Sequence, residues 1–120
     1  MLLFFIRELA TFGSIDMNDV LPAIEQWFAR GERVALATVV RTLGSAPRGV
    51  GAKMAVSSEG SIAGSVSGGC IEGTVFDACQ EALATGVSRL LHFGVADDEA
   101  WDVGLACGGT IDVFVEPLNW

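Results

Sequence analysis

The sequence has no tyrosine, one histidine, and only seven lysine and arginine residues among 120. With His92 as the single imidazole, acid–base chemistry near neutral pH is limited, and metal sites that need two histidines are excluded. Fifteen aspartates and glutamates bring the formal net charge to -8. Because a surface this acidic repels phosphate backbones and anionic headgroups, we expect no nucleic-acid partner and no membrane partner.

Long hydrophobic runs and paired cysteines are also missing. The apolar opening, Leu2 to Ile6, is far shorter than the roughly 20 residues of a membrane span. It has no basic segment before it and no small-residue cleavage site after it, so we expect no signal peptide. The three cysteines, Cys70, Cys79 and Cys107, show no CxxC spacing. This pattern argues against a disulfide scaffold or a structural zinc site and favours a reduced, cytoplasmic protein.

Hydrophobic residues make up 51% of the chain and charged residues 18%, which excludes intrinsic disorder. The length fits one domain, which we place at residues 19–120 after an N-terminal extension at residues 1–18. Hydrophobic periodicity predicts helices at 19–30 and 70–84. It predicts strands at 34–42, 52–57, 61–66, 89–93 and 110–116. We expect an α+β or mixed α/β fold in which two main helices pack against a mixed sheet of about five strands.

The first motif that could carry chemistry is the glycine–serine run from Gly64 to Cys70, which leads from a strand into a helix. Glycines turn backbone N–H groups outward, and a helix N-terminus attracts negative charge, so this run is typical of an anion cradle. Cys70 in the first helical turn would be partly thiolate, whereas Cys79 falls on the apolar face of the same helix. A simple capped turn explains the run equally well.

Two further glycine loops carry a thiol or positive charge. Cys107 is followed by Gly108 and Gly109 and precedes a strand, so no helix dipole activates it. Residues 41–53 hold three of the seven basic side chains, Arg41, Arg48 and Lys53, which favours an anionic ligand. We expect these cations to face the N-terminus of the second helix. A solvated loop whose cations pair with the excess acids is the alternative. His92, in mid-strand, is typical of a structural histidine.

Together the three loops resemble the XdhC/CoxI family, accessory proteins of xanthine dehydrogenase and related molybdenum hydroxylases. The resemblance rests on GSAPRGVGAKMAV at 44–56, GSVSGGCIE at 64–72 and GLACGG at 104–109 with VFVEP at 113–117. It implies a chaperone, rather than an enzyme, that binds molybdenum cofactor (molybdopterin) as cargo. Such a protein assists sulfuration of the cofactor or its insertion into a xanthine dehydrogenase or CO dehydrogenase type of apoenzyme.

The resemblance and the loop chemistry together indicate the site. We expect the cofactor to contact Ser45, Arg48, Ser65, Ser67, Gly68, Gly69, Cys70, Cys107, Gly108 and Gly109. Cys70 and Cys107 are also the candidates for a contact with molybdenum or its sulfur. Family members commonly continue into a Rossmann-like domain, and since the chain ends at Trp120, we expect a partner chain to supply it. Trp27, Phe28, Trp101 and Trp120 suggest an apolar surface for a partner or a second copy, hence a homo-oligomer.

Two other functions remain open at this point. A small sulfur-transfer or redox enzyme would use Cys70 as nucleophile and Cys107 as the resolving thiol. A protein-interaction module would use the glycine loops only as scaffolding.

Overall fold

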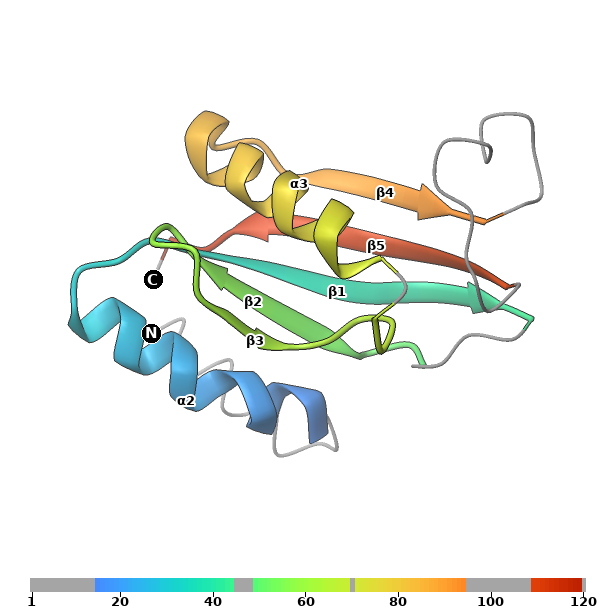
Figure 1. Cartoon of the computed structure of the whole chain (residues 1–120), viewed down its shortest axis with the longest axis horizontal. Helices are drawn as coiled ribbons and strands as arrows, with labels where there is room; N and C mark the ends of the chain where they lie inside the picture. Colours follow the sequence, from blue (N-terminus) through green and yellow to red (C-terminus); the bar gives the residue numbers. More distant parts are fainter. Residues whose placement is uncertain (1–14, 45–48, 70, 95–108, 120) are drawn as a thin grey trace.

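Two helices and five strands make up the part of the chain that the structure, a computed structural model, describes: residues 15–44, 49–69, 71–94 and 109–119. In chain order these elements are α2 (Ile15–Ala29), β1 (Val34–Leu43), β2 (Lys53–Ser57), β3 (Ile62–Gly64), α3 (Glu72–Thr85), β4 (Arg89–Phe93) and β5 (Thr110–Pro117). Figure 1 shows the strands lying side by side with the two helices packed against them.

The five strands form one sheet in the order β3-β2-β1-β5-β4, and each neighbouring pair is antiparallel. The expected class, an α+β domain with about five strands and two helices, is confirmed. The strand directions differ from the mixed sheet that we expected. Residues 44–52 and 58–61 are too short for a parallel crossover, which takes roughly a dozen residues or more, so they can only reverse the chain.

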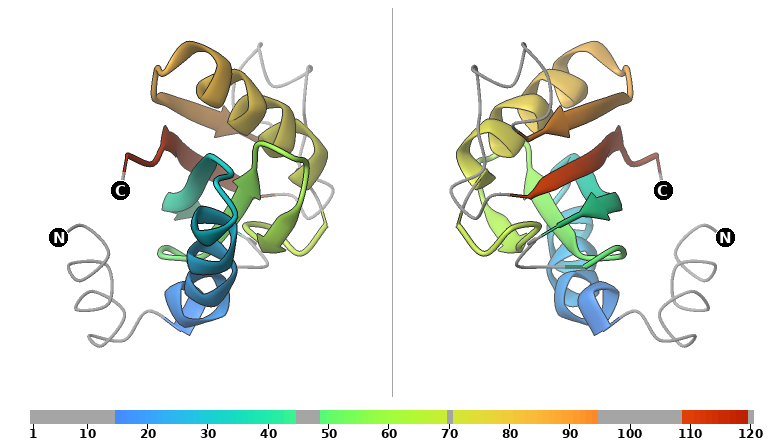
Figure 2. Two further views of the ribbon diagram at one scale, coloured as in Figure 1. Left: turned by 90° about the vertical axis from the view of Figure 1, so that its left-hand side faces the viewer. Right: turned by 90° about the vertical axis from the view of Figure 1, so that its right-hand side faces the viewer.

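β1 is the central strand, and its first half is buried on both faces. Ala35, Ala37 and Val39 belong to the core cluster beneath α3, whereas Val34 and Leu36 belong to the cluster beneath α2. α3 packs over β5, β1 and β2, and α2 packs on the other face over β2, β3 and β1. Figure 2 shows the two helices on the two sides of the sheet. The apolar first half of β1 is therefore explained by a helix on each side.

The helices begin at different residues from those that we expected. α2 begins at Ile15, four residues before the predicted start at residue 19, and it ends at Ala29. α3 begins at Glu72 rather than at residue 70, and it ends at Thr85, one residue beyond the predicted end. Gly86, which follows it, adopts a left-handed conformation with φ 76°. The division between an extension at 1–18 and a domain at 19–120 stays a prediction. No helix among the described residues is long and apolar enough to cross a membrane.

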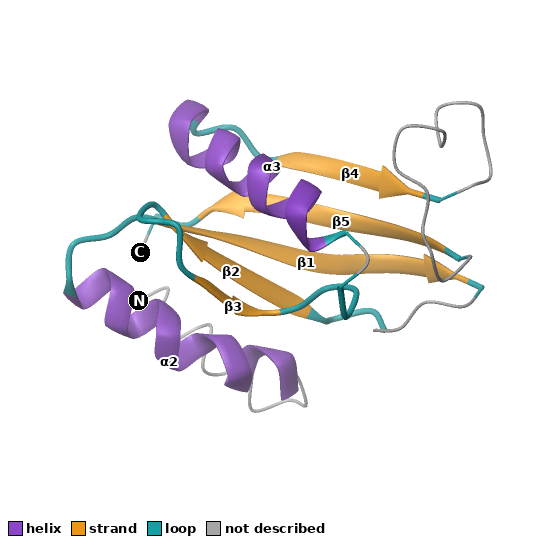
Figure 3. Cartoon of the chain, in the orientation of Figure 1, coloured by secondary structure: helices purple, strands orange, loops and turns teal. Residues whose placement is uncertain are grey.

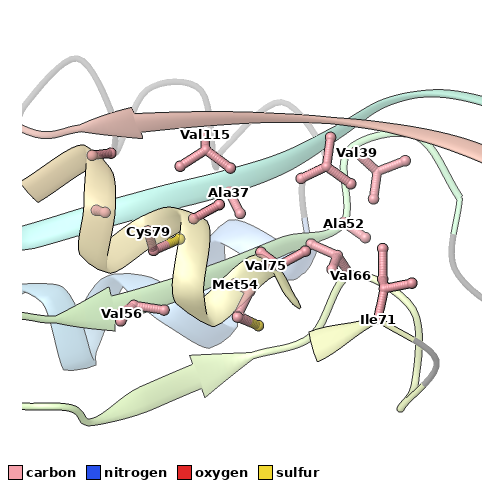
Figure 4. Packing of buried hydrophobic residues seen from close by; sticks show 14 of the residues in the cluster. Ala37, Val39, Ala52, Met54, Val56, Val66, Ile71, Val75, Cys79 and Val115 are labelled. Carbon is pink, nitrogen blue, oxygen red and sulfur yellow. The ribbon is translucent and has the colours of Figure 1, made fainter. Parts of the chain in front are cut away.

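Large apolar side chains fill both clusters. Trp27 is only 5% exposed, so it does not supply the exposed surface that we expected. Phe28 is partly buried against the α2 cluster, and Trp101 and Trp120 lie outside the described residues. Cys79 points from α3 into the core near Val75 and Val115, as Figure 4 shows, and is fully buried. Burial raises the pKa of the Cys79 thiol from 9.0 to about 12. The prediction that Cys79 is a packing residue is confirmed.

We therefore expect Cys79 to resist alkylation by iodoacetamide at pH 8 in the folded protein and to react once the protein is unfolded in urea. The thiol is both inaccessible and protonated at that pH. Peptide mapping by mass spectrometry measures the modification. Rapid modification of Cys79 under native conditions would contradict the position of α3 on the sheet.

Gly64 provides a test of the packing between β3 and α2. Its φ is +78°, and a Cβ there would lie 2.4 Å from the Lys53 carbonyl oxygen and 2.6 Å from Val20 Cγ1. We expect Gly64→Ala to lower the free energy of unfolding by about 2–4 kcal/mol, combining backbone strain with steric overlap. Gly60 has φ +94° with open space around it, so Gly60→Ala should cost only about 1–2 kcal/mol. Urea denaturation of both variants measures the difference, and equal losses would contradict the close contact.

Candidate functional site

The strand ends that flank the three glycine motifs lie at one end of the sheet. Leu43, the last residue of β1, pairs with Thr110, the first of β5, and Phe93 at the end of β4 pairs with Ile111. The first residue of β2, Lys53, accepts a hydrogen bond at its carbonyl from the Ser65 N–H, just beyond β3. In Figure 3 the ends of β1 and β4 and the start of β5 lie on the right, and the start of β2 and the end of β3 lie nearer the middle of the view. We call this region the loop end of the sheet.

Backbone and core contacts bring the described parts of the motifs together. A Cβ on Gly44 would lie 3.5 Å from the Gly109 Cα, so the flanks of the motif at 44–56 and the motif at 104–109 touch. Val66 and Ile71, on either side of the glycine pair, share a core cluster with Val39 and Ala52. Figure 4 shows these four side chains at the same end of the cluster. The glycine–serine motif at 64–72 is therefore anchored beside the start of β2, which belongs to the motif at 44–56.

The glycine–serine motif at 64–72 is organised by the carboxylate of its last residue. Glu72, the first residue of α3, accepts five hydrogen bonds from residues 65–69. Oε2 accepts from the Ser65 hydroxyl, the Val66 N–H at 3.1 Å and the Ser67 N–H at 2.9 Å. Oε1 accepts from the Ser67 hydroxyl at 2.5 Å and the Gly69 N–H at 2.9 Å. We call this the Glu72 network.

The two serine hydroxyls act as relays in this network. While each donates its hydrogen to Glu72, the Ser65 Oγ accepts from the Gly68 N–H at 2.8 Å and the Ser67 Oγ from the Ile71 N–H at 2.9 Å. Burial by itself raises the pKa of Glu72, but the bonds from Ser65, Ser67 and Gly69 outweigh it and lower the pKa from 4.5 to about 2. Glu72 is therefore ionised at neutral pH, and the loop is fixed around its charge.

The anion cradle predicted from the glycine–serine run does form, but the chain's own Glu72 fills it. The N–H groups of Val66, Ser67 and Gly69 point at this carboxylate rather than outward to a ligand. Ser67 is 1% exposed. Gly68 and Gly69 are exposed, both have positive φ, and a Cβ on Gly69 would meet nothing within 4 Å. The open surface of this motif is thus its glycine pair.

Half of the expected cofactor contacts cannot be placed. Ser45, Arg48, Cys70, Cys107 and Gly108 lie outside the described residues, and so does the proposed contact of Cys70 and Cys107 with a metal. Gly109 is described and buried at the start of β5, next to Gly44. No group of three or more histidine, cysteine or acidic side chains in the described ranges is arranged to hold a metal ion.

We predicted that three cations face the N-terminus of α3. This prediction is wrong for Arg41 and Lys53, the two of them that the structure describes. Lys53 directs its Nζ to Thr38 Oγ1 at 3.4 Å. Burial lowers the pKa of Lys53, and the charge of Glu116 offsets part of this shift. Arg41 pairs in register with Asp112, which alternates with residues that face α3. Both cations therefore lie on the face of the sheet opposite α3. A register shift between Val39 and Arg41 places Arg41 there.

His92, which we predicted to be a structural histidine, has one partner across the sheet, and its side chain is 49% exposed. It lies on β4 opposite Asp112 of β5, and its Nδ1 contacts the Asp112 carboxylate.

Sequence reasoning missed the role of Glu72, although it placed this residue in the motif. The signal is present in the sequence: an acidic residue directly after a glycine–serine run, three residues beyond Gly69, is the spacing at which a carboxylate reaches back to a backbone N–H.

The depressed pKa of Glu72 predicts how stability depends on pH. A carboxylate whose pKa is lower in the folded state stabilises the protein above its ordinary pKa of 4.5, and this contribution is lost as the pH falls toward 2. We expect Glu72→Gln to lower the free energy of unfolding by about 1–3 kcal/mol at pH 7. The difference from wild type should shrink between pH 4.5 and 2, as measured by denaturant unfolding.

Glu81→Gln is the matched control on the same helix, since Glu81 makes only an exposed ion pair with Arg89 at 2.9 Å. Its effect should be about 0–1 kcal/mol. A Glu72→Gln variant that is as stable as the control at pH 7 would contradict the Glu72 network.

Comparison with known proteins places the chain in a family. The model of the XdhC and CoxI family matches residues 27–94. Similar curated proteins include the molybdenum cofactor insertion chaperone PaoD of Escherichia coli, 35% identical over 87% of this chain and 32% of its own length. A probable xanthine dehydrogenase component from Bacillus subtilis is 37% identical over 73% of this chain and 27% of its own length.

A solved structure supports the same relationship. The crystal structure of a xanthine dehydrogenase from Bacillus halodurans matches with a TM-score of 0.67 and 29% identity, over 82% of this chain and 30% of that chain. The chain thus spans about a third or less of the length of these relatives. The matched family model covers more than half of the chain, so the chain belongs to the XdhC and CoxI family.

Proposed function

We propose that this domain binds molybdenum cofactor at the loop end of the sheet and assists its sulfuration or its insertion into a xanthine dehydrogenase or CO dehydrogenase type of molybdenum hydroxylase. The observation that carries the proposal is the convergence of three motif flanks at one end of the sheet. Membership of the family and the similarity to PaoD, named a molybdenum cofactor insertion chaperone, support the same role.

The described residues leave space for a bulky cargo, but the backbone N–H groups next to this space are not free to bind its negative charge. Gly68 and Gly69 are exposed, and the open space over Gly69 lets a flat ring system approach the backbone. The nearby N–H groups are bonded to Glu72, so they are not free to hold a phosphate. In this proposal the phosphate is held by Arg48, while the Glu72 network fixes the loop that leads to Cys70. Ser45, Cys107 and Gly108 complete the site.

In this proposal the thiols of Cys70 and Cys107 contact the molybdenum or its sulfur ligand. When bound, the cofactor supplies the sulfur and oxo chemistry of molybdenum, and the domain orients and protects it. This is the action of a cytoplasmic chaperone rather than an enzyme. The partners in this proposal are the apoenzyme, a Rossmann-like chain and a second copy of this domain.

Titration of the 120-residue protein with molybdopterin, followed by quenching of tryptophan fluorescence, tests the site. We expect saturable binding that weakens as salt is added, because ions screen the attraction between Arg48 and the phosphate. Arg48→Ala should weaken binding roughly 10- to 150-fold, the loss of one charge-assisted contact of about 1.5–3 kcal/mol.

Arg89→Ala is the control, since Arg89 lies on β4 and pairs with the exposed Glu81. It should bind molybdopterin as the wild type does. Equal affinity of Arg48→Ala and wild type would remove Arg48 from the site, and no binding by the wild type would sink the carrier role. A Cys70–Cys107 disulfide on isolation, without pterin binding, would favour the thiol enzyme. If the protein showed neither the disulfide nor pterin binding, the interaction module would be favoured.

A further inference from the structure

A shallow groove of about 560 Å³ lies beside β3, on the face of the sheet that carries α3. α3 packs over β5, β1 and β2, and the groove separates its first two turns from β3. Two apolar side chains line the groove: Ile62, which is 50% exposed, and Phe76, whose inner part packs against the core. Gly60 and Gly73, which have no side chains, leave the groove wide.

β3 is also an edge of the sheet, and no other described strand pairs with its outer side. The Ser57 N–H donates to the Ser61 carbonyl and the Ser65 N–H to the Lys53 carbonyl, which defines the hydrogen-bonded positions between β2 and β3. Since these positions alternate in an antiparallel pair, the N–H and C=O groups of Ile62 and Gly64 point away from β2. A row of such groups is a template for another strand.

The rim of the groove is acidic. Its lining contains the carboxylates of Glu72 and Asp77 and, among the described residues, no basic side chain. Glu72 is engaged by the 65–69 loop, but Asp77 is exposed on α3, and Glu59 is exposed in the turn next to Gly60. The other edge strand, β4, carries Arg89 and His92 and so lacks this acidic character. A partner at β3 is therefore selected for positive charge.

The geometry points to strand addition at β3: an extended segment of another polypeptide pairs with Ile62–Gly64, places an apolar side chain between Ile62 and Phe76, and directs basic side chains toward Asp77 and Glu59. Main-chain hydrogen bonds supply the affinity, and the groove and its acidic rim supply the specificity. Because Ile62 and Gly64 are the residues of β3 whose backbone groups point outward, the paired stretch is short and the binding is weak. This surface adjoins the loop end, since Gly64 precedes Ser65 and Glu72 lines the groove, but it does not rest on molybdopterin binding.

The test uses a fluorescein-labelled peptide, Arg-Thr-Val-Thr-Arg, in which valine and both arginines share one face of a strand. We expect it to bind the wild-type protein by fluorescence anisotropy, and we expect a Glu-Thr-Val-Thr-Glu peptide to bind at least tenfold more weakly. In amide hydrogen exchange by NMR, the Arg peptide should slow exchange at Ile62 and Gly64. The measurements contain no molybdopterin, so their failure is separate from failure of the cofactor site.

Three substitutions that introduce a lysine test whether the peptide binds at β3. Ile62→Lys and Asp77→Lys should each weaken binding of the Arg peptide at least tenfold, and Asp77 is exposed on a helix, so this variant keeps its fold even if Ile62→Lys does not. Leu90→Lys is the control, since Leu90 is 61% exposed on the other edge strand. Equal binding of both peptides, unchanged binding by Asp77→Lys, or equal losses at Leu90 and Asp77 would overturn the proposal. So would concentration-dependent protection of Ile62 and Gly64 without peptide, which would assign β3 to a second copy of this chain.

Discussion

The shape of the glycine–serine motif depends on one carboxylate. Glycines at 68 and 69 with positive φ give the loop freedom, and a loop with that freedom has no fixed conformation unless something holds it. Glu72 holds it with five hydrogen bonds and two serine relays, all within eight residues of sequence. The site is therefore preorganised by local contacts, while its place in the molecule comes from Val66 and Ile71 in the core.

This network also changes what the motif can offer to a ligand. Backbone N–H groups at the start of a helix are a common anion site, and here a covalently attached anion occupies them. An external phosphate would have to compete with a carboxylate that is ionised above a pH of about 2 and already present at high effective concentration. Recognition of an anionic cargo at this end of the sheet must therefore come from cations that the network does not engage. Arg41 and Lys53, on the opposite face, cannot supply them.

Local patterns predicted most of the fold, and three-dimensional contacts decided the rest. Periodicity and glycine placement predicted the apolar first half of β1, the strand at Arg89–Phe93, the end of α3 to within a residue and the buried Cys79, because burial and turn chemistry act over a few residues. They did not predict the face occupied by Arg41, since a register shift at Val40 reverses the side of every later residue on the strand. They also did not predict the antiparallel pairing of β5 with β1, which lies far earlier in the sequence. In the site, the sequence pattern identified the motif but assigned its donors to a ligand. Their partner, Glu72, lies three positions beyond Gly69, a spacing that indicates an internal carboxylate and that the prediction did not use.

Glu72 lies where the two surfaces that we propose adjoin. Glu72 lines the groove beside β3, while its oxygens face the 65–69 loop. A segment docked in the groove would reshape the loop only if it drew this carboxylate away from its donors, and all five bonds would then break together. Coupling between sites requires an element with two arrangements of similar free energy. The saturated Glu72 network favours one arrangement strongly, so the groove and the loop end are suited to act independently, one toward protein and the other toward cargo.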